Sequence, residues 1–207
     1  TIVISPLIAL MHDQVQALQA NGIPSAYINS SLSGAERFAI ERQCKAGEIK
    51  LLYISPEKLF SNGYLDWIKS LQVSMVAVDE SHCVSVWGHD FRPEYTQLHV
   101  LKSALPNVPF MALTATADRV TRKDVMTQLG IPEARVFISS FDRPNLSLSV
   151  QPGRNRLKTI QKFIQERPRK AGIIYCLSRK NTEQLADSLL KVGISARCYH
   201  AGMSTDE

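Results

Sequence analysis

The most informative stretch of this chain is V-A-V-D-E-S-H, at Val76–His82. A short apolar run ends there in two adjacent carboxylates, Asp79 and Glu80. In a parallel sheet such a run places the acids at the carboxyl edge, where α/β proteins bind ligands. One carboxylate can hold a hydrated Mg²⁺ while the next orients an attacking water, as nucleoside triphosphate hydrolysis requires. Taken alone, the pattern also describes a strand end followed by a helix N-cap.

The segment that follows, S-V-W-G-H-D-F-R-P at Ser85–Pro93, has neither a strand nor a helix period. Its Trp87, Phe91 and Arg92 are side chains that can stack on unpaired bases. Aromatic side chains in loops are more often buried beneath the loop, but the neighbours here are small or polar. The sequence therefore predicts a base-stacking loop joined directly to a nucleotide-hydrolysing element.

Strand-like and helix-like segments alternate along the chain, which predicts an α/β fold with a doubly wound parallel sheet. The expected strands are Thr1–Ser5, Ser25–Ile28, Ile49–Ile54, Val73–Val78, Phe110–Leu113, Arg135–Ser139, Gly172–Cys176 and Ser195–Tyr199. The expected helices contain or span Leu7–Leu18, Ala35–Lys45, Asp118–Leu129, Leu157–Ile164 and Asn181–Val192.

A polar, proline-containing stretch, S-F-D-R-P-N at Ser140–Asn145, predicts a hinge between domains 1–140 and 141–207. The second domain has two clear strands, too few for an independent sheet. The chain opens inside an expected strand and stops at S-T-D-E, residues 204–207, which resembles the start of another helix. We therefore expect the chain to be a segment of a longer protein.

Three further motifs carry groups that can bind phosphate or polar side chains. In L-T-A-T-A at Leu113–Ala117, two threonine hydroxyls can hydrogen-bond a neighbouring carboxylate or histidine; the alternative is a helix N-terminus capped by Thr116 or Asp118. Two Ser-Pro pairs each end an expected strand and begin a helix, where amides can bind phosphate or simply be capped. Y-H-A-G-M at Tyr199–Met203 fits either a phosphate contact or an ordinary β–α turn. The residues concerned are Thr114, Thr116, Ser5, Pro6, Ser55, Pro56, His200 and Gly202.

Composition narrows the class of protein. The 207 residues contain no apolar run of membrane-spanning length and no basic-then-apolar leader, so neither a membrane span nor a signal peptide is predicted. Four cysteines without C-x-x-C spacing favour reduced thiols in a cytosolic protein, with no zinc site in this segment. Residues 1–140 carry a net charge of −1 and residues 141–207 carry +6. That excess fits either a polyanion partner or a solvated helix face.

Taken together, six motifs resemble the RecQ helicases of superfamily 2, in the expected order and over nearly the whole chain. They are D-E-S-H at Asp79–His82, W-G-H-D-F-R-P-E-Y at Trp87–Tyr95, L-T-A-T-A at Leu113–Ala117, S-F-D-R-P-N at Ser140–Asn145, I-I-Y-C at Ile173–Cys176 and Y-H-A-G at Tyr199–Gly202.

The resemblance implies two RecA-like lobes, ATP with Mg²⁺, and 3′-to-5′ unwinding of DNA in repair and recombination. Asp79 would hold the metal and Glu80 would polarise the water. His82, Thr114 and Thr116 would link the nucleotide state to the grip on DNA. The expected DNA contacts are Trp87, Phe91 and Arg92, which would sense the single strand, and Ser5, Pro6, Ser55, Pro56, His200 and Gly202, which would line its path.

The chain also departs from the family. Ser81 stands where the family more often has alanine, and G-x-x-x-x-G-K-[ST], the phosphate-binding loop, does not occur in these residues. The first lobe is thus expected to lack its P-loop, and these residues alone are not expected to hydrolyse ATP. Zinc is expected only in a module outside the segment, as are contacts with a single-strand-binding protein or repair partners.

Two rival functions remain open. A D-E-x-H motif also fits an RNA helicase, and a lobe without a P-loop also fits a non-catalytic module that binds nucleic acid. The expected partners are single-stranded and duplex DNA rather than a membrane. The expected location is the bacterial cytoplasm at the nucleoid, or the nucleus in a eukaryote.

Overall fold

The structure is a computed structural model that describes residues 1–61, 63–88, 90–140 and 142–203. Three predictions fall partly or wholly outside the described residues. They concern His89 in the loop Ser85–Pro93, called the aromatic loop below, Phe141 in the predicted hinge, and the helix start expected at residues 204–207. The chain forms two compact units, Thr1–Ile138 and Ser139–Glu207. The domain boundary predicted after residue 140 stays a prediction.

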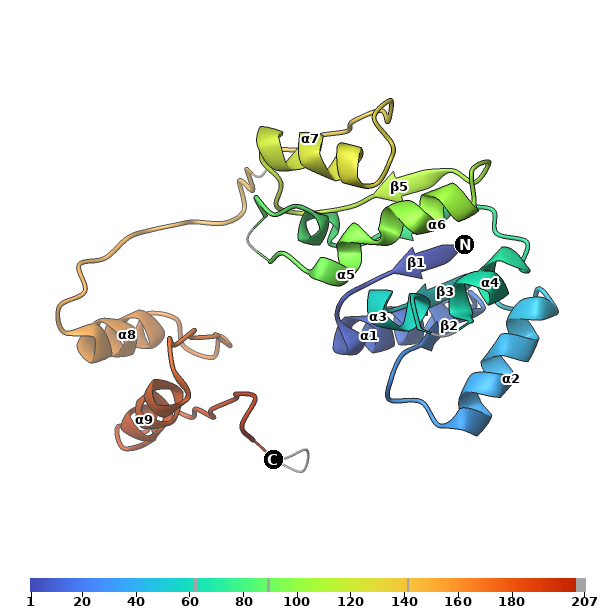
Figure 1. Cartoon of the computed structure of the whole chain (residues 1–207). Coiled ribbons are helices and arrows are strands. Elements are labelled where there is room, and N and C mark those ends of the chain that lie inside the picture. The colour runs from blue at the N-terminus through green and yellow to red at the C-terminus, as the bar shows by residue number, and fades with distance from the viewer. Residues whose placement is uncertain (62, 89, 141, 204–207) are drawn as a thin grey trace. The chain divides into compact units, whose positions relative to one another are not determined.

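The first unit is built on a five-stranded parallel sheet with the strand order β2-β3-β1-β4-β5 (Figure 1). Its strands are β1 (Ile2–Ile4), β2 (Ser25–Ile28), β3 (Leu51–Ile54), β4 (Val76–Val78) and β5 (Phe110–Ala112). The connecting helices are α1 (Ile8–Ala20), α2 (Gly34–Lys45), α3 (Pro56–Leu59), α4 (Tyr64–Lys69), α5 (Pro93–Thr96), α6 (Leu98–Ala104) and α7 (Arg119–Gln128), with a 3₁₀ turn, η1 (Ser81–Val84). The predicted α/β class is confirmed.

Apolar side chains alternate between the two faces of this sheet, as the pleat of a strand requires. On one face Ile4 and Val78 pack with α4, α6 and α7 in the larger core cluster. On the other face Val3 and Ala77 pack against α1 through its buried Met11 and Val15. Helices therefore cover both faces, which confirms the doubly wound arrangement.

The register of the sheet brings the ends of four strands together. Ile4 pairs with both Ile54 and Val78, and Val78 pairs with Ala112. Parallel strands in register end at the same edge, so the residues that follow these strands must lie beside one another. This edge carries Ser5, Ser55, Asp79 and, one residue further along, Thr114.

The described residues of the second unit form the helices α8 (Arg156–Gln165) and α9 (Arg179–Leu190). The strands predicted at Gly172–Cys176 and Ser195–Tyr199 are wrong, as is the one at Arg135–Ser139 near the end of the first unit: none of these three segments forms a strand. A strand needs a hydrogen-bonding neighbour. Within Gly172–Cys176, Ile173 and Tyr175 are 82% and 91% exposed. Among the described residues, no helix is long and apolar enough to cross a membrane.

Candidate active site and nucleic-acid interface

Asp79 and Glu80 lie at the carboxyl edge of the sheet, immediately after β4. The backbone N–H of Asp79 donates to the carbonyl of Ile4 at 2.9 Å, which continues the ladder by one residue. One carboxylate oxygen of Asp79 accepts the N–H of Glu80 at 2.9 Å. Both acids are half-buried rather than enclosed in the core. Their oxygens are hard donors at the sheet edge where α/β proteins bind ligands, so the pair fits a Mg²⁺ ion.

Glu80 adopts a left-handed backbone conformation, with φ 47° and ψ 42°. This conformation costs a non-glycine residue roughly 1–2 kcal/mol, and such residues cluster at functional sites. The turn lets the chain leave β4 and enter η1 at once. As a result, the Glu80 carboxylate faces the histidine two residues later.

His82 joins the acidic motif to the threonine motif. Its side chain is 6% exposed, and Nδ1 lies 2.9 Å from Oγ1 of Thr114 and 3.2 Å from Oε2 of Glu80. Thr114 Oγ1 also accepts the N–H of Thr116 at 3.2 Å. Sequence reasoning placed Glu80, His82, Thr114 and Thr116 together, and the structure brings all four into one connected group, with Thr116 contributing its backbone amide.

The capping alternative is decided in favour of Asp118. Its carboxylate accepts the N–H of Thr121 at 2.7 Å and so caps α7. That backbone hydrogen bond lowers the pKa of Asp118. Thr116 is therefore not the cap.

The carbonyl of Asp79 accepts a hydrogen bond from the Tyr95 hydroxyl at 3.1 Å. Tyr95 is fully buried, and burial raises the pKa of its phenol, with the Cys83 and Asp79 charges adding to the effect. The phenol therefore stays neutral and remains a donor. Sequence reasoning treated Tyr95 only as the end of the aromatic motif, and no local pattern indicates that its hydroxyl supports the acidic turn.

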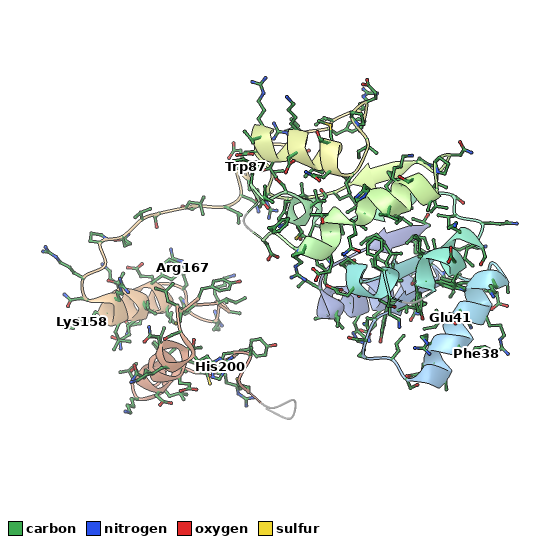
Figure 2. The ribbon with its side chains drawn as sticks, in the orientation of Figure 1. Phe38, Glu41, Trp87, Lys158, Arg167 and His200 are labelled. Carbon is green, nitrogen blue, oxygen red and sulfur yellow. The ribbon has the colours of Figure 1, made fainter. Side chains whose placement is uncertain are left out.

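The aromatic loop presents its rings to solvent. Trp87 is 72% exposed and Phe91 is 39% exposed, and Figure 2 shows Trp87 at the surface of the first unit. Arg92 differs from these two, because its guanidinium donates to the carbonyl of Pro6 at 3.2 Å and lies 3.6 Å from Asp90. The N–H of Arg92 donates to the carbonyl of Cys83 at 2.9 Å. Arg92 therefore anchors the loop, while Trp87 and Phe91 are available for stacking.

Gly88 lets this loop pass close to η1. A Cβ atom at position 88 would lie 2.4 Å from the carbonyl oxygen of His82, a backbone atom that cannot swing away. Its N–H donates to the carbonyl of Ser85 at 3.0 Å. Sequence reasoning missed Gly88, although a glycine between aromatic residues that needs close backbone approach is a usable signal.

Cys83, His82 and Asp90 offer metal-ligand atoms that lie within 4.8 Å of one another. Burial, then the charge of Asp90, raises the pKa of the Cys83 thiol to about 11. Metals bind the thiolate rather than the thiol. The protonated Cys83 instead contacts the Asp90 carboxylate at 3.8 Å. We assign no metal to this group.

The two Ser-Pro pairs differ. Ser55 accepts the N–H of Lys58 at 3.3 Å and caps α3, with Pro56 as its first residue, as predicted. At the other pair, α1 begins at Ile8 with Leu7 as its N-cap residue, so the prediction that Pro6 opens a helix is wrong. Ser5 is fully buried, and its hydroxyl has no hydrogen-bond partner among the described residues.

In the second unit, His200 and Gly202 form a small turn. Nε2 of His200 lies 3.0 Å from the carboxylate of Glu183 on α9, and Nδ1 of His200 accepts the N–H of Gly202 at 3.2 Å. This places His200 beside α9 within its own unit (Figure 2). Their predicted role in lining the strand's path stays a prediction.

The chain matches the family described as "DEAD/DEAH box helicase" over residues 1–125. It therefore belongs to the DEAD/DEAH box helicase family. Within that family, it is 48% identical over all 207 residues to "ATP-dependent DNA helicase RecQ" of Pasteurella multocida, and 41% identical over 207 residues to the protein of that name from Bacillus subtilis. It is also 42% identical over 214 residues to "RecQ-like DNA helicase BLM" of Xenopus laevis. These relatives confirm the resemblance to RecQ helicases.

The chain spans only part of these relatives, although they match 99–100% of it: 33% of the Pasteurella protein, 35% of the Bacillus protein and 16% of the Xenopus protein. Among solved structures, the helicase domain of Pyrococcus furiosus Hef matches 63% of this chain and 27% of that one, with 17% identity and a TM-score of 0.48.

Proposed function

We propose that this chain is the central part of an ATP-dependent DNA helicase of the RecQ type, which unwinds DNA in the 3′-to-5′ direction in repair and recombination. The observation that carries the proposal is one chain of contacts. It runs from the acids at the sheet edge through His82 to Thr114, beside a loop whose Trp87 ring is exposed. The helicase family of the chain and the names of its relatives support the same activity. The protein would act where DNA is, in the bacterial cytoplasm at the nucleoid or in a eukaryotic nucleus.

In this mechanism Asp79 would hold the magnesium of bound ATP, and that ion would supply the positive charge that neutralises the phosphates. Glu80 orients the attacking water, because its carboxylate is half-buried at the edge and extends from a strained turn that fixes its direction. The hydroxyl of Tyr95 donates a hydrogen bond to the carbonyl of Asp79, and this bond holds the turn in place. Together these residues bind, orient and position the groups that react.

The coupling of hydrolysis to DNA runs through His82. Because Nδ1 of His82 contacts both Glu80 and Thr114, a shift of the Glu80 carboxylate changes the hydrogen bonding of the threonine turn. The aromatic loop begins directly after η1, so its position depends on the same turn. Stacking of a base on Trp87 or Phe91 would therefore bias the geometry at Glu80.

The second unit would supply further contacts to the phosphate backbone. Its helix α8 and the residues beside it carry most of the positive excess, including Lys158 and Arg167 (Figure 2). His200 and Gly202 would line the strand's path, as Ser55 and Pro56 would in the first unit. We propose that ATP-driven closure of the two lobes moves the strand relative to the aromatic loop and that hydrolysis reopens them.

These 207 residues contain no G-x-x-x-x-G-K-[ST] sequence, so they do not supply the P-loop that binds the phosphates of ATP. We propose that the chain alone binds single-stranded DNA without turning over ATP. Titration of the isolated chain with single-stranded DNA at increasing salt tests the first half of this statement. Phosphate contacts predict an affinity that falls steeply as salt rises, and an affinity that does not depend on salt would contradict them.

The test of the catalytic assignment is Glu80→Gln in the full-length protein. The amide keeps the size of the side chain but cannot activate water, so nucleotide binding should persist while DNA-stimulated ATP hydrolysis falls by at least about 10²-fold. Glu48→Gln, an exposed acid-to-amide change away from this edge, is the matched control and should behave as the native protein. Undiminished turnover in Glu80→Gln would refute the assignment.

Strand displacement on matched DNA and RNA duplexes separates the proposed function from its rival. A RecQ-type enzyme should unwind the DNA duplex and leave the RNA duplex largely intact. Preferential unwinding of RNA would replace the proposal with an RNA helicase.

A further inference from the structure

Ser85 occupies an unusual position between η1 and the aromatic loop. Its side chain is fully buried, and its hydroxyl donates to Oδ2 of Asp124 at 2.6 Å. The same hydroxyl oxygen accepts the backbone N–H of Trp87 at 3.2 Å. The Ser85 carbonyl accepts the N–H of Gly88 at 3.0 Å. One serine therefore fixes the backbone on both sides of the exposed indole.

Asp124 is itself held firmly. It lies on α7, whose Thr121 and Val125 are buried on either side of it, and α7 packs directly against η1. A hydrogen bond from a buried hydroxyl to a carboxylate is among the stronger hydrogen bonds in proteins. Its short length matches that class. The Ser85–Asp124 bond thus ties the loop to a helix that the core keeps in place.

This bond joins the end of η1 to the segment after β5 at a point distant from two other links between these segments. Those links are the hydrogen bond from the N–H of Ser81 to the carbonyl of Leu113 at 2.9 Å and the contact between His82 and Thr114. Attachments at different points define an orientation, whereas a single attachment would leave a pivot. A movement of the loop therefore displaces both Thr114 and α7.

Resting on the proposed function above, we propose that Ser85 and Asp124 are positioning residues for DNA-stimulated hydrolysis. They hold the backbone of Trp87 in place. As a result, a base that stacks on the indole changes the geometry of the His82–Thr114 contact. Neither residue touches the nucleotide or the strand in this scheme. Their effect is on how much DNA is needed to stimulate the enzyme.

The experiment compares Asp124→Ala, Ser85→Ala and the double variant in the full-length protein. Each should raise the single-stranded DNA concentration that gives half-maximal ATPase stimulation by about tenfold, the scale of a lost charge-assisted hydrogen bond. The double variant should be no worse than Ser85→Ala, because Asp124→Ala removes only a bond that Ser85→Ala has already removed. The maximal rate at saturating DNA should change far less than the half-maximal concentration.

Two matched variants sharpen the result. Gln128→Ala removes a different hydrogen bond of Asp124, the one that Oδ1 accepts from Gln128 at 3.3 Å, and leaves the Ser85–Asp124 bond intact. It should therefore match the native protein. Asp124→Asn keeps an oxygen that can accept from Ser85, so it should lose less than Asp124→Ala.

The outcomes separate this inference from the proposed function. If the native full-length protein shows no DNA-stimulated ATPase, the proposed function fails. If the native protein is stimulated and Asp124→Ala matches Gln128→Ala, the positioning role is overturned. It is also overturned if the maximal rate and the melting temperature fall together without a change in the half-maximal DNA concentration, because that pattern indicates a purely structural role. Should Asp124→Ala not fold, Ser85→Ala and Asp124→Asn decide the question by the same measurement.

Discussion

Val76–Val78 and Gly172–Cys176 are both short apolar runs, yet only the first is a strand. The former, β4, pairs with β1 on one side and β5 on the other, and each of its three residues is buried. The latter pairs with nothing among the described residues of its unit, and its Ile173 is 82% exposed. An apolar run shows a capacity to pair, and a strand exists only where neighbouring strands accept its hydrogen bonds.

The largest effect should come from placing a charge in each of the two runs. Val78→Asp buries a carboxylate in a fully apolar neighbourhood and should cost the first unit about 4 kcal/mol or more, or prevent its folding. Ile173→Asp in the 207-residue chain should cost less than about 0.5 kcal/mol, because that side chain already faces water. Urea unfolding followed by circular dichroism measures both variants, and the fluorescence of Trp67 and Trp87 reports on the first unit. Equal losses in the two variants would show that residues 172–176 are also buried in a sheet.

A smaller contrast is expected between two glycines. Gly88→Ala places a Cβ against the His82 backbone and should cost on the order of 1–3 kcal/mol, or displace the loop and alter the environment of Trp87. Gly172→Ala meets nothing within 4 Å and should be silent. Acrylamide quenching of tryptophan emission together with urea unfolding detects either result. An unchanged Gly88→Ala protein would mean that the loop does not approach η1 as described.

The smallest contrast concerns two helix caps. Asp118 caps α7 and Ser178 caps α9, each through an N–H three residues later. Replacing either by alanine should lower the melting temperature of its own unit by a few degrees at most.

Only the stabilisation by the Asp118 cap should depend on pH, because Ser178 carries no titratable group. Its folded pKa is lowered, so its contribution is present above the ordinary carboxyl pKa near 3.8 and is lost as the pH falls through the folded value. Thermal scans of both alanine variants at pH 7 and at pH 3 test this. The deficit of Asp118→Ala should shrink at pH 3, while that of Ser178→Ala should stay constant. If the loss of melting temperature in Asp118→Ala does not change with pH, the charge of Asp118 does not contribute to the stability of the cap.

The elements of the first unit were largely predictable, because their signals are local. Leu7, Met11, Val15 and Leu18 recur at helical spacing, and α1 spans nearly the expected residues. The strand at Ser25–Ile28 appears with the predicted bounds. The strand expected at Arg135–Ser139 does not form, and the helices α4, α5 and α6 were not predicted. The remaining errors lie at the ends of elements, as at β3, which begins at Leu51 rather than Ile49. Where a strand begins depends on where its neighbour still offers a partner.

The residues of the candidate site also fall into those that a local motif predicted and those that it did not. Asp79, Glu80 and His82 were found from a motif of four consecutive residues, and Thr114 from another motif on a neighbouring strand. Ser85, Tyr95 and Asp124 escaped notice because each acts through a partner distant in sequence: the bond from Ser85 reaches 39 residues ahead. Ser5 and Ser55 look alike in sequence but differ in the structure, since only Ser55 caps a helix.

From its order of residues alone, this chain already specified a parallel α/β unit, an acidic turn after one strand and a ring-bearing loop beyond it. These follow from periodicity and from side-chain chemistry, which act over a few residues. The tertiary structure decided which apolar runs became strands, which serine became a cap, and which buried hydroxyls and carboxylates hold the loop beside the acids. Those outcomes depend on hydrogen-bond partners, and a partner's position is set by packing of the whole unit.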